Sequence, residues 1–135
     1  VVALRQRGIA MMFQEHRLFP ELSAVDNVML KSCLTGFADE GEVRGMLMRL
    51  GLGAHLDVPC GMMSFGQQQR VAFVRALCQP ADFFLLDEPV SHIDEGNALV
   101  MAKMLTERVQ SDGAGVIVTS IGYRLPYEYD HILRL

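Results

Sequence analysis

The sequence predicts an α/β fold, a parallel sheet into which a helical subdomain is inserted. Short apolar runs typical of buried strands occur near the start, in the second half and near the end of the 135 residues. Helical patterns separate these runs, and strands that alternate with helices favour a parallel sheet. The longest separation, from Ala24 to about Gln79, consists of helical patterns and therefore predicts the inserted subdomain.

The first strand and the first helix have clear boundaries in the sequence. Residues 8–13, "GIAMMF", are an apolar run that ends at the polar "QEHR", so Gln14 is expected at the exit of a strand. Ser23, followed three residues later by Asp26, is a helix start that resembles a capping box. Apolar residues at helical spacing extend this helix to about Leu34.

Two further helices are expected before the second strand. A turn-rich break over residues 35–42 precedes an amphipathic helix that closes at Gly51. Ser64 and Gln67 have the S-x-x-Q spacing of a capping box, in which each side chain bonds to the backbone amide of the other residue. The apolar face that follows predicts a helix, and Pro80 ends it.

The second half of the chain alternates strands with one helix. Residues 83–86, "FFLL", predict a strand buried on both faces of a parallel sheet. Apolar residues at helical spacing from Ala98 to Val109 predict a helix. The run "GAGVIVTS" at 113–120 predicts a third strand, and "HILRL" at 131–135 a fourth.

Composition and charge exclude several classes of function. The net charge is −4, and the scattered basic residues are outnumbered by sixteen acidic ones, so we expect no nucleic-acid partner. The longest charge-free runs, residues 58–69 and 113–123, are shorter than the roughly 18 apolar residues of a membrane span. The three cysteines form no C-x-x-C pair and suggest neither a zinc site nor a disulfide framework.

Asp87 and Glu88 are the first candidates for chemistry. They follow the apolar run 83–86 directly, and ligands of open α/β sheets bind at the carboxyl ends of the strands. An aspartate there can hold Mg²⁺, directly or through water, and an adjacent glutamate can orient or deprotonate an attacking water. The alternative is a turn with two solvated charges, which an isolated Asp-Glu pair would favour.

Four stretches together resemble a known family. They are "FQ" at 13–14, "MSFGQQQRVAFVRAL" at 63–77, "FFLLDEP" at 83–89 and "SHID" at 91–94. In order and approximate spacing they resemble the Q-loop, a variant of the LSGGQ signature, the Walker B strand and the D-loop of ATP-binding cassette (ABC) ATPases. The resemblance spans nearly the whole chain and implies the RecA-like core of a P-loop NTPase.

The resemblance assigns the first group of residues to nucleotide binding. Gln14 would contact the Mg²⁺ and its water shell, and would relay the nucleotide state to a membrane partner. The signature turn from Ser64 through Phe65 and Gly66 to Gln67 would bind the γ-phosphate of ATP held by the opposite subunit of a head-to-tail dimer. A helix N-terminus with exposed amides suits that task, because it attracts anions.

The second group surrounds the reacting phosphate. By the same resemblance, Asp87 would hold Mg²⁺ through water and Glu88 would be the general base. Ser91 and Asp94 in the D-loop would contact the nucleotide and join the two active sites across the dimer. The family usually places a histidine after the strand "VIVT", and the position here is Ser120, which is shorter and cannot take up a proton near neutral pH as histidine can.

The chain lacks one element of the family. No G-x-x-x-x-G-K-[ST] phosphate loop occurs, and the only lysines, Lys31 and Lys103, have no glycine context. We therefore expect a partial nucleotide-binding domain without the Walker A part, inactive by itself. Residues 1–15 and 81–135 would form its core subdomain, and residues 16–80 its helical, signature-bearing subdomain.

The leading hypothesis is ATP hydrolysis by the nucleotide-binding subunit of an ABC membrane transporter, with ATP and Mg²⁺ as ligands. The partners would be a second ABC ATPase subunit and a transmembrane permease, for which "LFPEL" at 18–22 offers an apolar docking surface. The location would be cytoplasmic, on the inner face of the cell membrane. One alternative is a degenerate cassette with a regulatory or structural role, and another is a soluble ABC ATPase outside transport.

Overall fold

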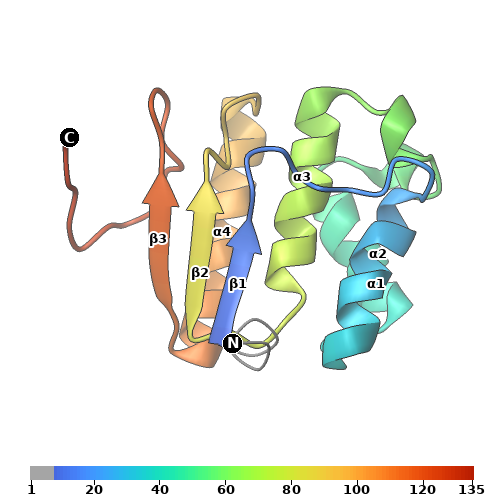
Figure 1. Ribbon diagram of the computed structural model, residues 1–135, viewed down its shortest axis with the longest axis horizontal. Coiled ribbons are helices and arrows are strands. Elements are labelled where there is room, and N and C mark those ends of the chain that lie inside the picture. The colour runs from blue at the N-terminus through green and yellow to red at the C-terminus, as the bar shows by residue number, and fades with distance from the viewer. Residues whose placement is uncertain (1–7) are drawn as a thin grey trace.

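Three parallel strands form the sheet of the protein. The computed structural model describes residues 8–135, and its strands are β1 (Ile9–Met12), β2 (Phe83–Asp87) and β3 (Gly115–Thr119), in the order β1-β2-β3. The register pairs Met12 with Leu86 and Asp87 with Thr119, so all three strands end at the same edge (Figure 1). The predicted α/β class and the first three predicted strands are confirmed.

The helices divide into two groups. Helices α1 (Ala24–Thr35), α2 (Glu40–Arg49) and α3 (Phe65–Leu77) pack against one another beyond β1, and α3 also contacts β1. Helix α4 (Glu95–Asp112) runs along one side of the sheet, as Figure 1 shows. Two short 3-10 turns, Gly53–His55 and Cys60–Met62, connect α2 to α3.

The helix starts follow from local side-chain bonds. The Ser23 hydroxyl accepts from the amide of Asp26 at 3.1 Å and caps α1. Helix α2 begins earlier than predicted, because Asp39 and Glu42 form a capping box inside the stretch 35–42 that we expected to be a turn-rich break. An aspartate followed three residues later by a glutamate is the signal that the sequence prediction passed over.

The strand β2 is buried on one face only, which corrects the expectation of burial on both. Phe84 and Leu86 are in the core, whereas Phe83 is half exposed and Met11 and Ile117 on the neighbouring strands are exposed as well. Within residues 8–135 the helices cover the face that Phe84 and Leu86 share, and the opposite face has no helix packed on it. The alternation of burial along β2 follows from this arrangement.

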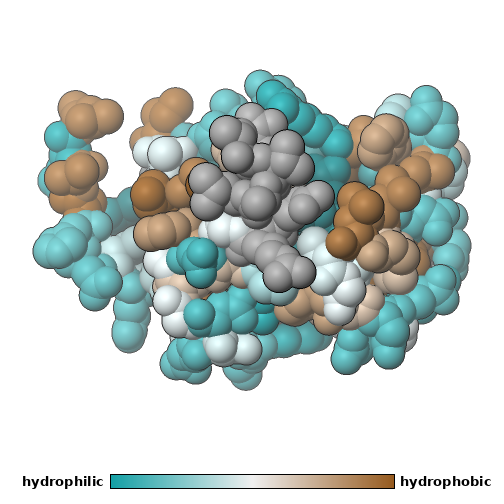
Figure 2. All heavy atoms as spheres, turned by 60° about the horizontal axis from the view of Figure 1, so that its bottom comes forward, coloured by the Kyte–Doolittle hydropathy of each residue, from teal (hydrophilic) through white to brown (hydrophobic). Residues whose placement is uncertain are grey.

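The predicted fourth strand is wrong. Residues 131–135 pair with no strand in the described part of the chain, and β3 is the last strand of the sheet. Ile132 and Leu133 are therefore exposed. Figure 2 shows apolar surface at two opposite ends of the molecule, one at the end that carries the C-terminus and one at the end that carries α1, where Leu30 and Leu34 are exposed. Among residues 8–135, no helix combines the length and the hydrophobicity that a bilayer crossing needs.

Candidate functional site

The carboxyl ends of β1 and β2 bring the first candidate residues together. Asp87 is the last residue of β2, and one of its carboxylate oxygens accepts a hydrogen bond from the Thr119 hydroxyl over 2.5 Å. Gln14 lies two residues beyond Met12, as Glu88 lies two residues beyond Leu86, the partner of Met12 in the register. The strand pairing therefore places Gln14 at the same edge of the sheet as Asp87 and Glu88.

Glu88 is held in an uncommon backbone conformation. Its φ is +49°, in the left-handed region that non-glycine residues rarely adopt. Its amide donates to the carbonyl oxygen of Thr119 at 2.9 Å, and its carboxylate accepts from the amide of Ile121 at 2.5 Å. Strained residues of this kind persist only where the surroundings fix them, and they cluster at functional sites.

Ser120 lies between these two partners of Glu88. It follows β3 directly and is half-buried, with Thr119 before it and Ile121 after it. The position that the family resemblance assigns to a histidine is thus one residue away from the amide that holds the Glu88 carboxylate.

The residues present fit a magnesium ion bound mainly by water and phosphate. Asp87 supplies a carboxylate at the surface, and Gln14 supplies an exposed amide oxygen. No group of three or more His, Cys, Asp or Glu residues between positions 8 and 135 could hold a metal. Mg²⁺ often binds through one or two carboxylates and completes its shell with waters and substrate phosphates, so the Asp87 carboxylate and the Gln14 amide oxygen would suit it.

The signature turn has the predicted capping box. The Gln67 amide donates to the Ser64 hydroxyl at 3.1 Å, and the Gln67 side-chain oxygen accepts from the Ser64 amide at 2.9 Å. Gly66 lies against the loop that follows β2, because a Cβ atom added to it would stand 2.6 Å from the carbonyl oxygen of His92. Only a residue without a side chain fits at this position.

Phe65 connects this turn to two other loops. Its ring centroid lies 4.5 Å from that of His16 and 4.3 Å from that of His92, with both ring pairs tilted. The first histidine lies two residues after Gln14, and the second lies in the D-loop-like stretch 91–94. Three segments that are far apart in the sequence therefore meet at a single phenylalanine.

The side chain of Gln69 joins α3 to the strand end, and the sequence analysis missed it. It donates to the Glu88 carbonyl oxygen at 2.7 Å and to the Ser91 hydroxyl at 3.0 Å, and it accepts from the His92 amide at 3.1 Å. Gln69 is fully buried on the face of α3 that also carries Phe73. A polar residue four positions before a core phenylalanine was the signal that could have identified it.

Asp94 caps α4. Its carboxylate accepts from the backbone amide of Asn97 at 2.9 Å and from the Asn97 side chain at 2.7 Å. The first of these bonds, and then the second, lowers the pKa of Asp94 below its ordinary value. Asp94 thus has a structural role within the chain. The family resemblance implies a second role for it, across a dimer.

The turn after Gln14 is also held by α3. His16 and Arg17 have φ values of +59° and +53°, and the guanidinium of Arg75 donates to the carbonyl oxygens of both residues. His16 is buried, and its Nε2 atom has no hydrogen-bond partner among residues 8–135. Burial, and then the charges of Arg75 and His92, lower the pKa of His16.

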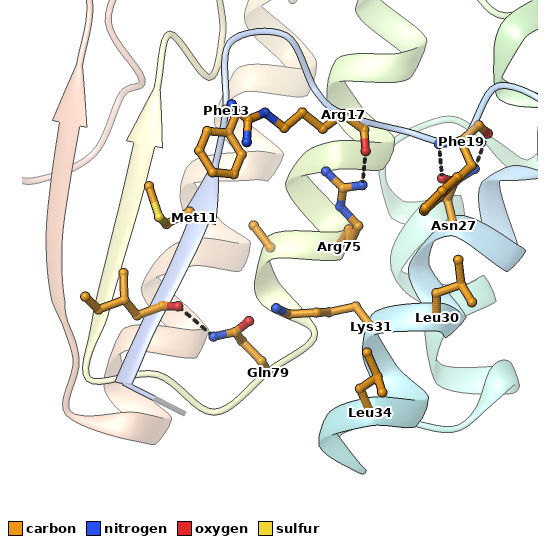
Figure 3. Close-up of a pocket in the computed structure, with 12 residues that line it drawn as sticks. Met11, Phe13, Arg17, Phe19, Asn27, Leu30, Lys31, Leu34, Arg75 and Gln79 are labelled. Atoms are coloured by element: carbon orange, nitrogen blue, oxygen red, sulfur yellow. Dashed lines mark hydrogen bonds between the residues drawn. The ribbon is translucent and has the colours of Figure 1, made fainter. Parts of the chain in front are cut away.

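A groove lies beside this turn, between β1, α1 and α3. It encloses about 590 Å³ and is lined by apolar and basic side chains, which Figure 3 shows: Met11, Phe13, Phe19, Leu30, Leu34, Arg17, Lys31 and Arg75. Lys31 has no acidic partner in the described part of the chain. Burial and the neighbouring Arg75 lower the pKa of Lys31.

Comparisons with known proteins place these features in one family. The family model for ABC transporters matches residues 2–91. The lipoprotein-releasing system ATP-binding protein LolD of Jannaschia sp. (strain CCS1) is 34% identical over 98% of the chain and 60% of its own length. The macrolide export ATP-binding/permease protein MacB of Syntrophobacter fumaroxidans (strain DSM 10017 / MPOB) is 36% identical over 87% of the chain and 17% of its own length.

A solved structure agrees with the fold. The dimeric structure of MJ0796, a bacterial ABC transporter cassette, superimposes with a TM-score of 0.75 at 26% identity, covering 87% of this chain and 54% of that one. The chain spans only part of both relatives, 60% of the length of the LolD protein and 54% of the solved cassette. The expected P-loop NTPase fold is confirmed, and the chain belongs to the ABC transporter family of ATP-binding proteins.

Proposed function

We propose that the protein binds and hydrolyses ATP as the nucleotide-binding subunit of an ABC membrane transporter. The observation that carries the proposal is the placement of Glu88, which stands at the carboxyl end of β2 and is bonded to both α3 and the segment after β3. A carboxylate fixed in this way beside a second carboxylate, Asp87, suits phosphoryl transfer to water. That reaction is catalysed mainly by positioning and charge neutralisation.

Each residue at the strand end has a proposed role. Glu88 is the general base that accepts a proton from the attacking water, and Asp87, with Gln14, holds the magnesium ion through water. Mg²⁺ supplies charge neutralisation at the phosphates when it is bound. The Thr119 hydroxyl, which donates to Asp87 at 2.5 Å, keeps that carboxylate oriented.

The signature turn serves the nucleotide of a second subunit in this proposal. Ser64, Phe65, Gly66 and Gln67 open α3 at the surface, where a helix N-terminus favours a phosphate oxygen. Ser91, which is bonded to Gln69 of α3, and Asp94, which caps α4, are proposed to join the two sites across the dimer. The dimeric form in which a structural relative was solved supports an assembly of two subunits. The head-to-tail arrangement, with ATP between the subunits, is part of the proposal.

The activity requires a phosphate-binding loop, a G-x-x-x-x-G-K-[ST] sequence that residues 1–135 do not contain. We propose that a longer chain, called the full-length protein below, supplies this loop in addition to residues 1–135. In it, residues 1–15 and 81–135 belong to the core subdomain and residues 16–80 to the helical subdomain. The mutual packing of α1, α2 and α3 supports that division.

The partner is proposed to be a transmembrane permease, which would hold the protein on the inner, cytoplasmic face of the membrane. The groove beside β1, with the exposed Phe19 and the basic Arg17 and Lys31, is the candidate docking surface. The names of the LolD and MacB relatives, an ATP-binding protein of a lipoprotein-releasing system and an ATP-binding/permease protein, support a transport system.

Magnesium-dependent phosphate release from ATP tests the proposal on the full-length protein. We expect hydrolysis by the wild type and a loss of roughly a thousandfold or more in the Glu88→Gln variant, because the base is removed. ATP binding, followed with a fluorescent analogue, should persist in that variant. Hydrolysis that continues undiminished in Glu88→Gln would exclude Glu88 as the base.

A degenerate cassette with a regulatory or structural role is the second candidate, and Ser120 is the observation that favours it. Serine cannot replace the reach and the protonation of a histidine near the γ-phosphate. The intact Glu88 favours hydrolysis instead. A Ser120→His variant separates the two: a gain in turnover shows that Ser120 limits an active enzyme, whereas two inactive proteins that still bind ATP support the degenerate cassette.

A further inference from the structure

The contacts of Phe65 single it out among the residues of the signature turn. The family signature has a glycine at this position, whereas this chain has a ring that touches His16 on one side and His92 on the other. Phe65 remains partly exposed, so its burial in the core does not explain the two contacts. The ring instead links three loops.

The histidine on the Q-loop side, His16, packs directly against Phe65. His16 is 2% exposed, and its Nε2 atom has no hydrogen-bond partner among residues 8–135. The backbone of its turn is fixed by Arg75 of α3, but no polar bond holds Nε2 of the ring. Packing against Phe65 is therefore one of the restraints on the orientation of the imidazole.

The histidine on the D-loop side is tied into the same helix at three points. Its amide donates to the Gln69 side chain at 3.1 Å, and its ring contacts Phe65. Its carbonyl oxygen lies 2.6 Å from the position that a Cβ atom of Gly66 would take. A movement of the first turn of α3 must therefore move the loop around His92. Because Gln69 also binds the Glu88 carbonyl oxygen, this loop and the proposed base share one support.

We propose that Phe65 is a positioning residue that couples the phosphate site of its turn to the catalytic loops of its own subunit. The inference rests on the proposed head-to-tail dimer, in which the signature turn contacts the nucleotide of the other subunit. Binding there shifts the first turn of α3, and the Phe65 ring transmits the shift to the His16 and His92 loops. The two active sites of the dimer are thereby coupled through an aromatic stack.

The geometry is tested first, by NMR of the imidazole protons in the full-length protein. Ring currents of Phe65 shift the signals of His16 and His92, so Phe65→Leu should move both sets of signals. Phe37→Leu, which alters a phenylalanine that packs on Arg108, is the matched control and should leave both unchanged. Unchanged histidine signals in Phe65→Leu would show that the stack is absent in solution.

Coupling is tested by the dependence of hydrolysis on ATP concentration. If both sites close at the same time, the rate of the wild type depends cooperatively on the ATP concentration. In Phe65→Leu the Hill coefficient should fall toward 1. We also expect kcat to decrease about tenfold, because the catalytic loops are misplaced. The affinity for ATP, measured in a Glu88→Gln background, should change less than the rate. Phe65→Tyr, which keeps the ring, should restore the cooperative curve.

The outcomes separate the two proposals. An active wild type whose cooperativity and kcat survive in Phe65→Leu overturns the coupling role and leaves the proposed ATPase function intact. A wild type that hydrolyses no ATP overturns both. Loss of cooperativity in Phe65→Leu with recovery in Phe65→Tyr supports the coupling role. The effect would then depend on the presence of an aromatic ring at position 65, which a general loss of folding would not.

Discussion

The side chain of Gln69 in α3 donates a hydrogen bond to the backbone carbonyl oxygen of Glu88 over 2.7 Å. The same buried amide also holds the Ser91 hydroxyl and the amide of His92. A backbone bent into the left-handed region at Glu88 needs such support, since that conformation is strained for a glutamate. The signature helix therefore determines where the proposed base stands.

Replacement of Gln69 by leucine should weaken both folding and catalysis. The variant keeps the volume of the side chain but leaves the Glu88 carbonyl and the His92 amide without their partner, at a cost of about 2 kcal/mol in the free energy of unfolding. We expect kcat of the full-length protein to fall at least roughly tenfold as Glu88 moves. Gln110→Leu, at an exposed position of α4, is the control for denaturation and turnover. Equal behaviour of the two variants would contradict the supporting role of Gln69.

The buried His16 should make stability depend on pH. Burial, followed by Arg75 and His92, lowers its pKa below the ordinary value of 6.5, so the folded protein binds this proton less readily than the unfolded chain. The contribution to stability is complete above that ordinary value and is lost as the pH falls from it toward the lower folded pKa. The slope it adds is at most about 1.4 kcal/mol per pH unit.

Denaturant unfolding at pH 7.5 and 5.5 measures this effect. The His16→Asn variant is the matched comparison, because asparagine tolerates the left-handed backbone of this residue and does not titrate. The wild type should lose more stability than the variant between the two pH values. Identical losses would mean that another group causes the pH dependence.

Thiol labelling should distinguish the three cysteines. Cys33 is exposed, whereas Cys60 and Cys78 are buried. Burial raises the pKa of Cys60 and raises that of Cys78 to about 12, so neither forms much thiolate near pH 8. We expect mass-spectrometric mapping to find label on Cys33 within minutes and on the other two only after unfolding. Rapid labelling of Cys78 in the folded protein would contradict its burial against Met46 of α2.

The sequence predicted those parts of the fold that depend on local patterns. The caps at Ser23 and Ser64 and the strand before Asp87 were found because each has its signal within a few residues. The start of α2 has an equally local signal at Asp39, which the prediction overlooked. The strand expected at 131–135 failed for a different reason, because a strand requires a neighbour to pair with and an apolar run does not reveal one.

The connections within the candidate site were beyond a reading of the sequence. Phe65, His16 and His92 are separated by long stretches of chain, and no spacing rule indicates that their rings meet. The role of Gln69 was not predicted, because it is one of three consecutive glutamines that the sequence does not distinguish. Which of the three is buried depends on the direction in which each points from the helix. Such contacts depend on how α3 lies against the strand end, which is a property of the tertiary structure.

Substitution by alanine at two helical glycines should change the free energy of unfolding in opposite directions. A Cβ atom at Gly66 would lie 2.6 Å from the carbonyl oxygen of His92, and because that atom belongs to the backbone the loop must shift, at about 1 to 3 kcal/mol. A Cβ atom at Gly45, inside α2, would meet no atom within 4 Å apart from its chain neighbours and the backbone of its own helix. Alanine there should therefore stabilise the protein by about 1 kcal/mol through its higher helix propensity. Urea unfolding of both variants measures the difference. A neutral Gly66→Ala would mean that the loop around His92 yields easily, and the coupling proposed for Phe65 would then lose its rigid support.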